Sequence, residues 1–259
     1  MAIAYSNSLA NNNSGGAGGS STDAFTTNSG DTALYVAVCN RGNGTVTSMA
    51  YNGDAMTLIE SVTSGAYILY LYYLPNPDIG AYNIVTQTSG TVSNISIGAW
   101  SGSGSNISVA TPVNTSNSVA SDTTLTTNLT STTGWTVLFA YSVAGGSHTI
   151  SAGTGSTQRA ESEGNPDNIA VYDSNAQVAG STSMAVTTGS AARILTVMAT
   201  VPLDITITAT DTNVTTESIN YGLSFFASDT NTTTDLVSFA DWENKPKSTA
   251  PSWSNQSKS

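Results

Sequence analysis

Residues 45–59, Thr-Val-Thr-Ser-Met-Ala-Tyr-Asn-Gly-Asp-Ala-Met-Thr-Leu-Ile, form the stretch that decides the fold. Two runs of β-branched and apolar residues flank the dipeptide Asn52-Gly53. Asn-Gly suits a type I′ turn, because both central residues of that turn need a positive φ. The stretch therefore predicts a β-hairpin, with strands at 45–51 and 55–59.

Strand patterns continue on both sides of this hairpin. Turn signals separate them about every 8–12 residues, which is typical of a sandwich or barrel. Tyr67–Leu74 is apolar on both faces and predicts a central strand that is covered on both sides. Asn11–Ser21 is rich in Asn, Gly and Ser and predicts a flexible loop. The other predicted strands are 2–9, Leu34–Cys39, Tyr82–Val85, Ile95–Ala99, Leu125–Leu129, Trp135–Tyr141 and Arg193–Val201. No amphipathic helix and no βαβ spacing is visible, so we expect an all-β, antiparallel fold.

The sequence pattern changes after Pro202, from strand-like runs to short repeats, which predicts two regions, 1–202 and 203–259. The second contains short repeats: residues 209–213 recur at 227–231, and 242–248 recur in part at 253–259. We expect a small β region there. A segment of this size buries too little surface to be stable alone. The main domain, sister chains or a larger assembly would stabilise it.

The composition favours a neutral, polar surface. Only 9% of the 259 residues are charged, and the net charge is −11. Ser, Thr and Asn make up roughly two-fifths of the chain, far above average usage. The acidic balance opposes binding to nucleic acid, and Arg41, Arg159 and Arg193 look scattered through the body. No secretory signal is visible, and the longest apolar run is too short to span a bilayer.

Residues with catalytic chemistry are few. Cys39 lies in an apolar run and predicts a buried, unreactive thiol. With His148 as the one histidine, a zinc site lacks ligands. No Gly-x-Ser-x-Gly elbow accompanies His148, which we expect to be exposed in a loop. Paired carboxylates hydrolyse glycosides, but Glu161, Glu163 and Asp167 lie in a Gly/Pro-containing stretch that reads as a solvated turn. We expect no enzyme and no cofactor.

Calcium is the exception that we keep as a possible ligand. Two groups of hard oxygen donors recur at loop spacing: Asp211 and Asn213 with Glu217, and Asp229 and Asn231 with Asp235. Neither group forms the full twelve-residue calcium loop. Asp and Asn are also ordinary turn residues, which is the alternative reading.

Four tryptophans divide into two pairs. Trp100 and Trp135 lie within or beside strands, where core packing is expected. The other pair lies in the polar C-terminal repeats, each followed five residues later by lysine. An aromatic anchor among polar residues is a usual interface hot spot. The predicted interface residues are Trp242, Lys247, Trp253 and Lys258.

Several stretches of 2–201 resemble, in order, a family of Ser/Thr/Gly-rich β-sandwich modules of phage structural proteins and bacterial surface proteins. The matching stretches are 34–38, 46–57, 73–77 with 80–82, 98–102, 111–112 and 157–159. The Trp-x-Asn-x-x-Lys-Ser repeats also look like the ends of phage virion proteins. The resemblance implies a jelly-roll or lectin-like sandwich displayed on a particle or cell surface, and it carries no catalytic residues to transfer.

We therefore expect a bacteriophage virion structural protein, a capsid decoration or head-fibre subunit located on the virion surface. Its partners would be the major capsid protein or other virion proteins, and it would form a homo-oligomer such as a trimer. A tail-fibre or adhesin subunit that binds cell-surface glycan is the alternative. A module of a secreted enzyme or of a cell-surface array is a third reading. Neither nucleic acid nor membrane is an expected partner.

Overall fold

A computed structural model describes residues 3–14, 20–105, 112–144, 149–162, 167–176 and 178–202. All of them lie in the first of the chain's two units, Met1–Asp204. The described part consists of β-strands and turns and contains no helix, hence none that could cross a membrane. All strand pairs are antiparallel. The predicted all-β, antiparallel sandwich class is confirmed. The predicted region 203–259 lies outside the described residues.

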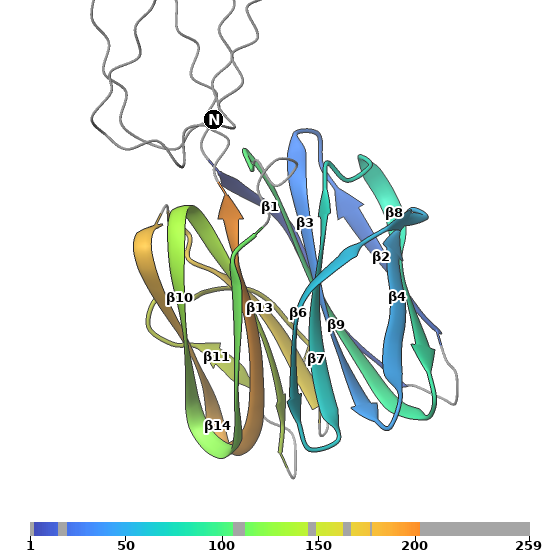
Figure 1. Cartoon of the computed structure of the whole chain (residues 1–259), viewed down its shortest axis with the longest axis vertical. Helices are drawn as coiled ribbons and strands as arrows, with labels where there is room; N and C mark the ends of the chain where they lie inside the picture. The colour runs from blue at the N-terminus through green and yellow to red at the C-terminus, as the bar shows by residue number, and fades with distance from the viewer. Residues whose placement is uncertain are drawn as a thin grey trace, which may run out of the picture. The chain divides into compact units, whose positions relative to one another are not determined.

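Fourteen strands make up the described part (Figure 1). They are β1 (Ala4–Ser14), β2 (Ser20–Thr27), β3 (Asp31–Gly42), β4 (Thr45–Tyr51), β5 (Asp54–Ala55), β6 (Thr57–Ser64), β7 (Tyr67–Pro75), β8 (Gly80–Ser89), β9 (Val92–Ser103), β10 (Asn114–Val143), β11 (Ile150–Ala152), β12 (Thr157–Ser162), β13 (Asp167–Asp173) and β14 (Val178–Pro202).

The first nine strands form one sandwich of two sheets. One sheet has the order β1-β9-β3-β7-β6, and the other has the order β2-β8-β4-β5. If β5 and β6 are counted together as the fifth strand, β7, β8 and β9 become the sixth, seventh and eighth strands. One sheet then has the order first, eighth, third, sixth, and the other has the order second, seventh, fourth. This is the order of a jelly roll. An apolar core that includes Phe25, Met49, Tyr51, Ile84 and Ile97 fills the space between the sheets.

The remaining strands form a second sandwich, in which β10 and β14 each serve more than one sheet. Register shifts interrupt β10 between Val119 and Asp122 and between Ser131 and Gly134. The two ends of β10, 114–119 and 134–143, flank the second part of β14, 193–202. The middle of β10 pairs instead with the first part of β14, which also pairs with β11. A separate core, with Leu125, Leu138, Tyr172, Met184 and Ile194 among its members, lies inside this sandwich.

The two sandwiches are structural repeats of one another. The three segments of β10, then β11, β12, β13 and the two parts of β14, take in order the places of β1 to β4 and β6 to β9. A β-bulge supports this equivalence. It separates Leu58 from Glu60 opposite β7, and the same irregularity separates Gln158 from Ala160 opposite β13. Since bulges are specific features of a strand pair, two at matching positions support the structural repeat.

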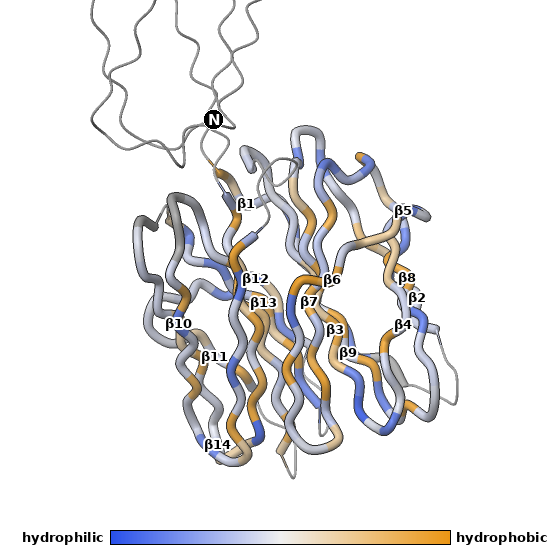
Figure 2. The backbone as a smooth tube through the Cα atoms, in the orientation of Figure 1, coloured by the Kyte–Doolittle hydropathy of each residue, from blue (hydrophilic) through white to orange (hydrophobic). Residues whose placement is uncertain are grey.

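The repeats pack through their large sheets, and we call this contact the seam. Its core includes Tyr35, Trp100, Phe139, Val171 and Val197, all fully buried. β1 of the first sandwich lies against β12 and β13, and β10 of the second lies against β6. Figure 1 shows the resulting succession of sheets, and Figure 2 shows hydrophobic positions concentrated along strands such as β3, β7, β9 and β13. The second sandwich and the seam are features that the sequence patterns did not predict.

Most local predictions are confirmed. Asn52 and Gly53 have φ values of 49° and 89°, as the predicted turn requires. β7 is covered on both faces, because Leu69 and Leu71 point into the seam while Tyr70 and Tyr72 point into the first sandwich. The loop predicted from Asn11 is wrong in part, because β1 continues to Ser14 along β9. Pairing with an existing strand supplies the backbone hydrogen bonds that local composition disfavours.

Gly98 on β9 allows the two large sheets to approach. A Cβ atom there would lie 3.0 Å from Val171 Cγ2 and 3.2 Å from Phe139 Cδ1, both across the seam. Replacing Gly98 by valine is expected to lower the free energy of unfolding by about 1–3 kcal/mol, since overpacked cores shift backbone and rotamers. Chemical denaturation measures this. Gly189→Val is the control, because no atom lies within 4 Å of a Cβ at Gly189. Equal stability of the two variants would contradict the close approach.

Candidate functional site

All three arginines of the chain lie at the seam, although they look scattered in the sequence. Arg159, from β12, is near β1, whereas Arg41, from β3, and Arg193, from β14, share one aromatic ring. Arg41 and Arg159 each contact residues of both sandwiches. The Arg193 side chain contacts residues of the opposite sandwich. The seam therefore concentrates the described cations of an acidic protein.

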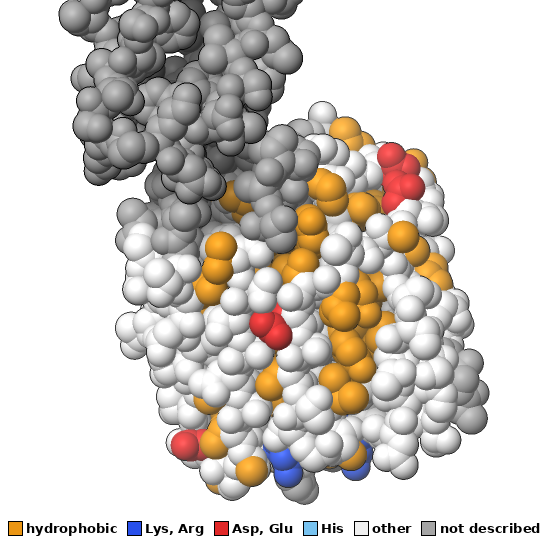
Figure 3. All heavy atoms as spheres, viewed as in Figure 1, with side chains coloured by type: hydrophobic (Ala, Val, Ile, Leu, Met, Phe, Trp, Pro, Cys, Tyr) orange, Lys and Arg blue, Asp and Glu red, His pale blue; other side chains and the backbone are white. Residues whose placement is uncertain are grey.

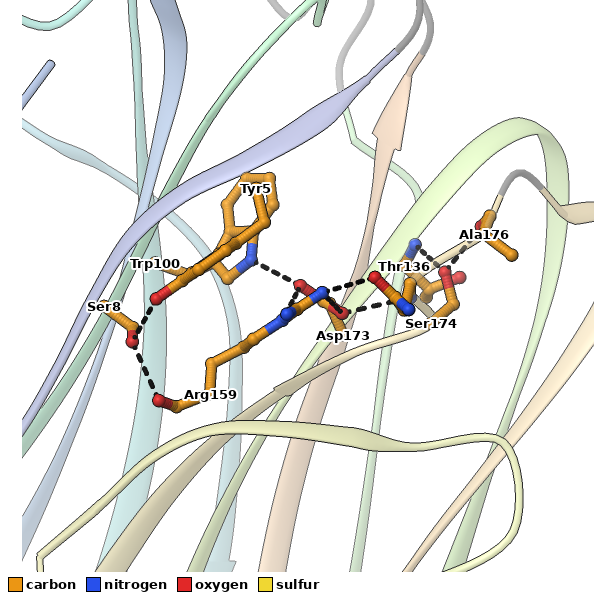
Figure 4. Close-up of polar contacts among 9 residues, drawn as sticks. Tyr5, Ser8, Trp100, Thr136, Arg159, Asp173, Ser174 and Ala176 are labelled. Carbon is orange, nitrogen blue, oxygen red and sulfur yellow. Dashed lines mark hydrogen bonds and ion pairs between the residues drawn. The ribbon is translucent and has the colours of Figure 1, made fainter.

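One buried carboxylate organises the first polar cluster, which Figure 4 shows. Asp173, fully buried, accepts two hydrogen bonds from Arg159: Nε to Oδ2 at 2.8 Å and an Nη to Oδ1 at 2.9 Å. Trp100 Nε1, from the other sandwich, donates to Oδ2 at 2.9 Å, and the Asn175 backbone N–H donates to Oδ1 at 3.0 Å. A buried charge is tolerated when it is paired and fully hydrogen-bonded, and this one is.

The Asp173 cluster also fastens the edge strand β1. The Arg159 guanidinium lies 4.3 Å from the centre of the Tyr5 ring (Figure 4). Ser8 donates a hydrogen bond of 3.1 Å to the Arg159 carbonyl, and the Ser8 and Tyr5 hydroxyls are 2.9 Å apart. These contacts join β1 to β12 of the second sandwich, so the ion pair positions two elements at once.

A second buried carboxylate, Asp167, organises the other cluster. Tyr141 donates a hydrogen bond to Asp167 Oδ1, and Asn94 Nδ2 donates to Oδ2 at 2.9 Å. Arg41 contacts Oδ2 at 3.3 Å. Asp167 is only 5% exposed, so the prediction of a solvated turn is wrong at this residue. The reason is tertiary: the first sandwich supplies two donors that no local pattern reveals.

The groups around Asp167 are held in their neutral forms. Burial, together with Cys39 and Asp167 nearby, raises the pKa of the Tyr141 hydroxyl. Burial, together with Asp167, raises the pKa of the Cys39 thiol well above its ordinary value. The predicted burial of Cys39 is confirmed, and a raised pKa disfavours the thiolate, which is the reactive form of cysteine.

Arg41, Tyr67 and Arg193 form what we call the arginine pair site. Arg41 is the cross-strand partner of Tyr67, and its Cζ lies 5.8 Å from the ring centre. Arg193 Cζ, from the second sandwich, lies 5.7 Å from the same centre. An Arg193 Nη donates to Ser64 Oγ at 2.5 Å and lies beside Gly65, in the β6–β7 turn. The site thus places two cations against one aromatic ring, one from each sandwich.

Other residues singled out in the sequence have plain structural roles or lie elsewhere. Glu161 is on β12 and accepts hydrogen bonds from the Ile150 backbone N–H and from Gln158. Trp100 is fully buried, as predicted, and Trp135 is half-buried against the seam. Within the described ranges no three His, Cys, Asp or Glu side chains form a metal-binding group. The remaining predicted residues lie outside the described residues: His148, Glu163, Asp211, Asn213, Glu217, Asp229, Asn231, Asp235, Trp242, Lys247, Trp253 and Lys258.

The geometry of the described part is that of a rigid double sandwich with polar clusters at its seam. These clusters join sheets, and Arg41 of the Asp167 cluster also belongs to the arginine pair site beside the β6–β7 turn. Comparisons with protein-family models, with curated proteins and with solved structures give no match.

Proposed function

We propose that this chain is a non-catalytic structural protein of a bacteriophage particle, displayed on the virion surface as a capsid decoration or head-fibre subunit. One observation carries the proposal: both ends of the described unit lie at the same end of the double sandwich. Ala4, at the start of β1, and Asp31, at the start of β3, are both cross-strand partners of Ser103. Tyr35, near that start of β3, donates a hydrogen bond of 2.7 Å to the carbonyl of Thr200, close to the end of β14. In Figure 1 the start of β1 and the tip of β14 lie side by side. The unit is thus built for attachment at one end.

The opposite end carries turns of both sandwiches. The β3–β4, β6–β7 and β8–β9 turns of the first repeat reach that end, as do the reversals of β10 near 120 and of β14 near 190 in the second. Turns positioned by a rigid scaffold are where binding residues usually lie. A subunit attached at one end and presenting turns at the other suits outward display.

The surface of the described part supports display rather than chemistry. Exposed acidic residues are few, namely Asp54, Asp78 and Asp122, and the rest of the exposed positions are mostly Thr, Ser, Asn and Gly. The face in Figure 3 is largely uncharged, with isolated acidic and basic side chains. Hydroxyl and amide surfaces contact partners through many weak bonds, and multiple copies on a particle would add avidity.

Attachment through the C-terminal repeats is the part of this proposal that mutation tests most directly. Replacing both Trp242 and Trp253 by alanine is expected to abolish incorporation into particles, because aromatic anchors supply most of an interface's binding energy. Immunoblotting of purified particles measures it. Ser248→Ala with Ser259→Ala changes the same repeats without touching the aromatics and should incorporate normally. Normal incorporation of the tryptophan variant would contradict the proposed attachment.

A tail-fibre or adhesin subunit that binds cell-surface glycan is the second candidate, and the arginine pair site favours it. Copy number per particle separates the two roles. Hundreds of copies indicate a decoration, whereas a handful indicates a fibre. Quantitative mass spectrometry against the major capsid protein gives that number.

A further inference from the structure

We infer that the arginine pair site binds the anionic group of an acidic sugar, with Arg41 and Arg193 as the two donors. This inference rests on the second candidate function, glycan binding, and gives its ligand class. It requires nothing of the predicted attachment region.

The first argument is the geometry of the guanidinium groups. Both lie against one ring, that of Tyr67, so the two Cζ atoms are separated by at most the sum of 5.8 and 5.7 Å. A guanidinium has five N–H donors in a fixed fork, suited to bidentate bonds with carboxylate or phosphate. Arg193 uses one nitrogen on Ser64, and Arg41 uses one on Asp167. Each arginine therefore keeps further donors beyond those bonds.

The second argument is the local charge. Arg41 and Arg193 contribute two positive charges, and Asp167 is the carboxylate in contact with the site. The Asp167 charge is shared with Tyr141 and Asn94. A net positive site on a protein of net charge −11 favours a small, singly charged group. A long polyanion would be repelled by the rest of the surface.

The third argument is accessibility and support. The Arg41 side chain is 37% exposed, and Arg193 is half-buried. The site lies where β3 ends and β7 begins, at the turn-rich end. Figure 3 shows basic side chains at that end and none elsewhere on the visible face. Hydroxyl and amide side chains nearby, Ser64 and Asn94, suit the remaining hydroxyls of a sugar.

The test uses three sugars that differ at one carbon: galactose, galacturonic acid and galactose 6-phosphate. We expect ligand-observed NMR with the full chain to show binding of an acidic sugar and no binding of galactose. The carboxylate and phosphate arms identify which acid the site takes. Binding should weaken as salt is raised, because the contact is partly exposed and ionic.

Arg193→Gln is the decisive variant, since Arg193 has no carboxylate contact among the described residues and its loss should leave the fold intact. We expect binding to weaken at least tenfold, with an unchanged circular dichroism spectrum. Thr124→Glu controls for net charge, because it makes the protein more negative by the same single charge at an exposed position of β10. Equal binding of galactose, no binding of either acid, or full binding by Arg193→Gln would overturn the inference. None of these results bears on copy number in particles, so the virion proposal would stand or fall separately.

Discussion

Replacing Asp173 by asparagine is expected to lower the free energy of unfolding by about 3–5 kcal/mol, the usual effect of breaking a buried ion pair. Asp173 accepts four hydrogen bonds, two of them from Arg159, and has no exposed surface. An asparagine fits the same space, but its amide nitrogen cannot accept a bond. Arg159 would keep its charge in a half-buried place without a counterion. Urea denaturation followed by tryptophan fluorescence measures the change.

Asp54→Asn is the matched control for Asp173→Asn, because it makes the same chemical change at an exposed residue of β5. We expect it to alter stability by less than about 0.5 kcal/mol. Arg159→Met, added to Asp173→Asn, should recover part of the loss, because it removes the unpaired cation. If Asp173→Asn were as stable as Asp54→Asn, the Asp173 cluster would not hold the seam.

Local structure was predictable wherever strand and turn chemistry are strong. Asn52-Gly53 predicted its own turn, since few other residues take positive φ at two successive positions. The apolar run at 67–74 predicted a strand between two cores, because both of its faces need cover. Trp100 and Cys39 are buried as their apolar surroundings indicate. Each of these predictions depends on a pattern within a single segment.

The structural repeat was not predictable in the same way. Equivalent positions such as Ile84 and Val186, or Met49 and Ile150, share burial rather than identity. A strand with one buried face requires only apolar residues at alternate positions, so two repeats can share one architecture although their sequences differ. The repeat here spans about a whole jelly roll, well beyond the 20–50 residues at which internal repeats are usually sought.

The seam clusters also escaped prediction, although a signal was present. Arg193 begins a predicted strand rather than a polar loop, and an arginine at such a place indicates a buried partner. Which carboxylate pairs with which arginine depends on how the two sandwiches face each other. Asp167 shows why local patterns cannot predict such a cluster: its donor Asn94 lies far from it in sequence and belongs to the other repeat.

Raising the pH above 10 is expected to unfold the double sandwich between about pH 11 and 14. Burial raises the pKa of Tyr35, Tyr141 and Tyr172, so each stays protonated in the folded state. Their unfolded forms lose a proton near pH 10. Stability is therefore undiminished below pH 10 and falls above it, by about 1.4 kcal/mol per pH unit for each tyrosine. Three tyrosines together remove about 4 kcal/mol per pH unit, against a usual total of about 5–15 kcal/mol.

Tyrosinate absorbance and far-ultraviolet circular dichroism, recorded on the same samples, check this. The part of the tyrosinate absorbance that comes from the buried hydroxyls should change together with the circular dichroism, because these hydroxyls ionise only as the sheets open. Tyr72→Phe is the informative variant: burial raises the pKa of Tyr72 to about 12, so it too opposes folding above pH 10. Phenylalanine keeps the ring and removes the proton, so alkaline unfolding should shift to higher pH while stability at pH 7 changes little. Ionisation of all tyrosines before any loss of β-structure would contradict the burial that joins the two sandwiches.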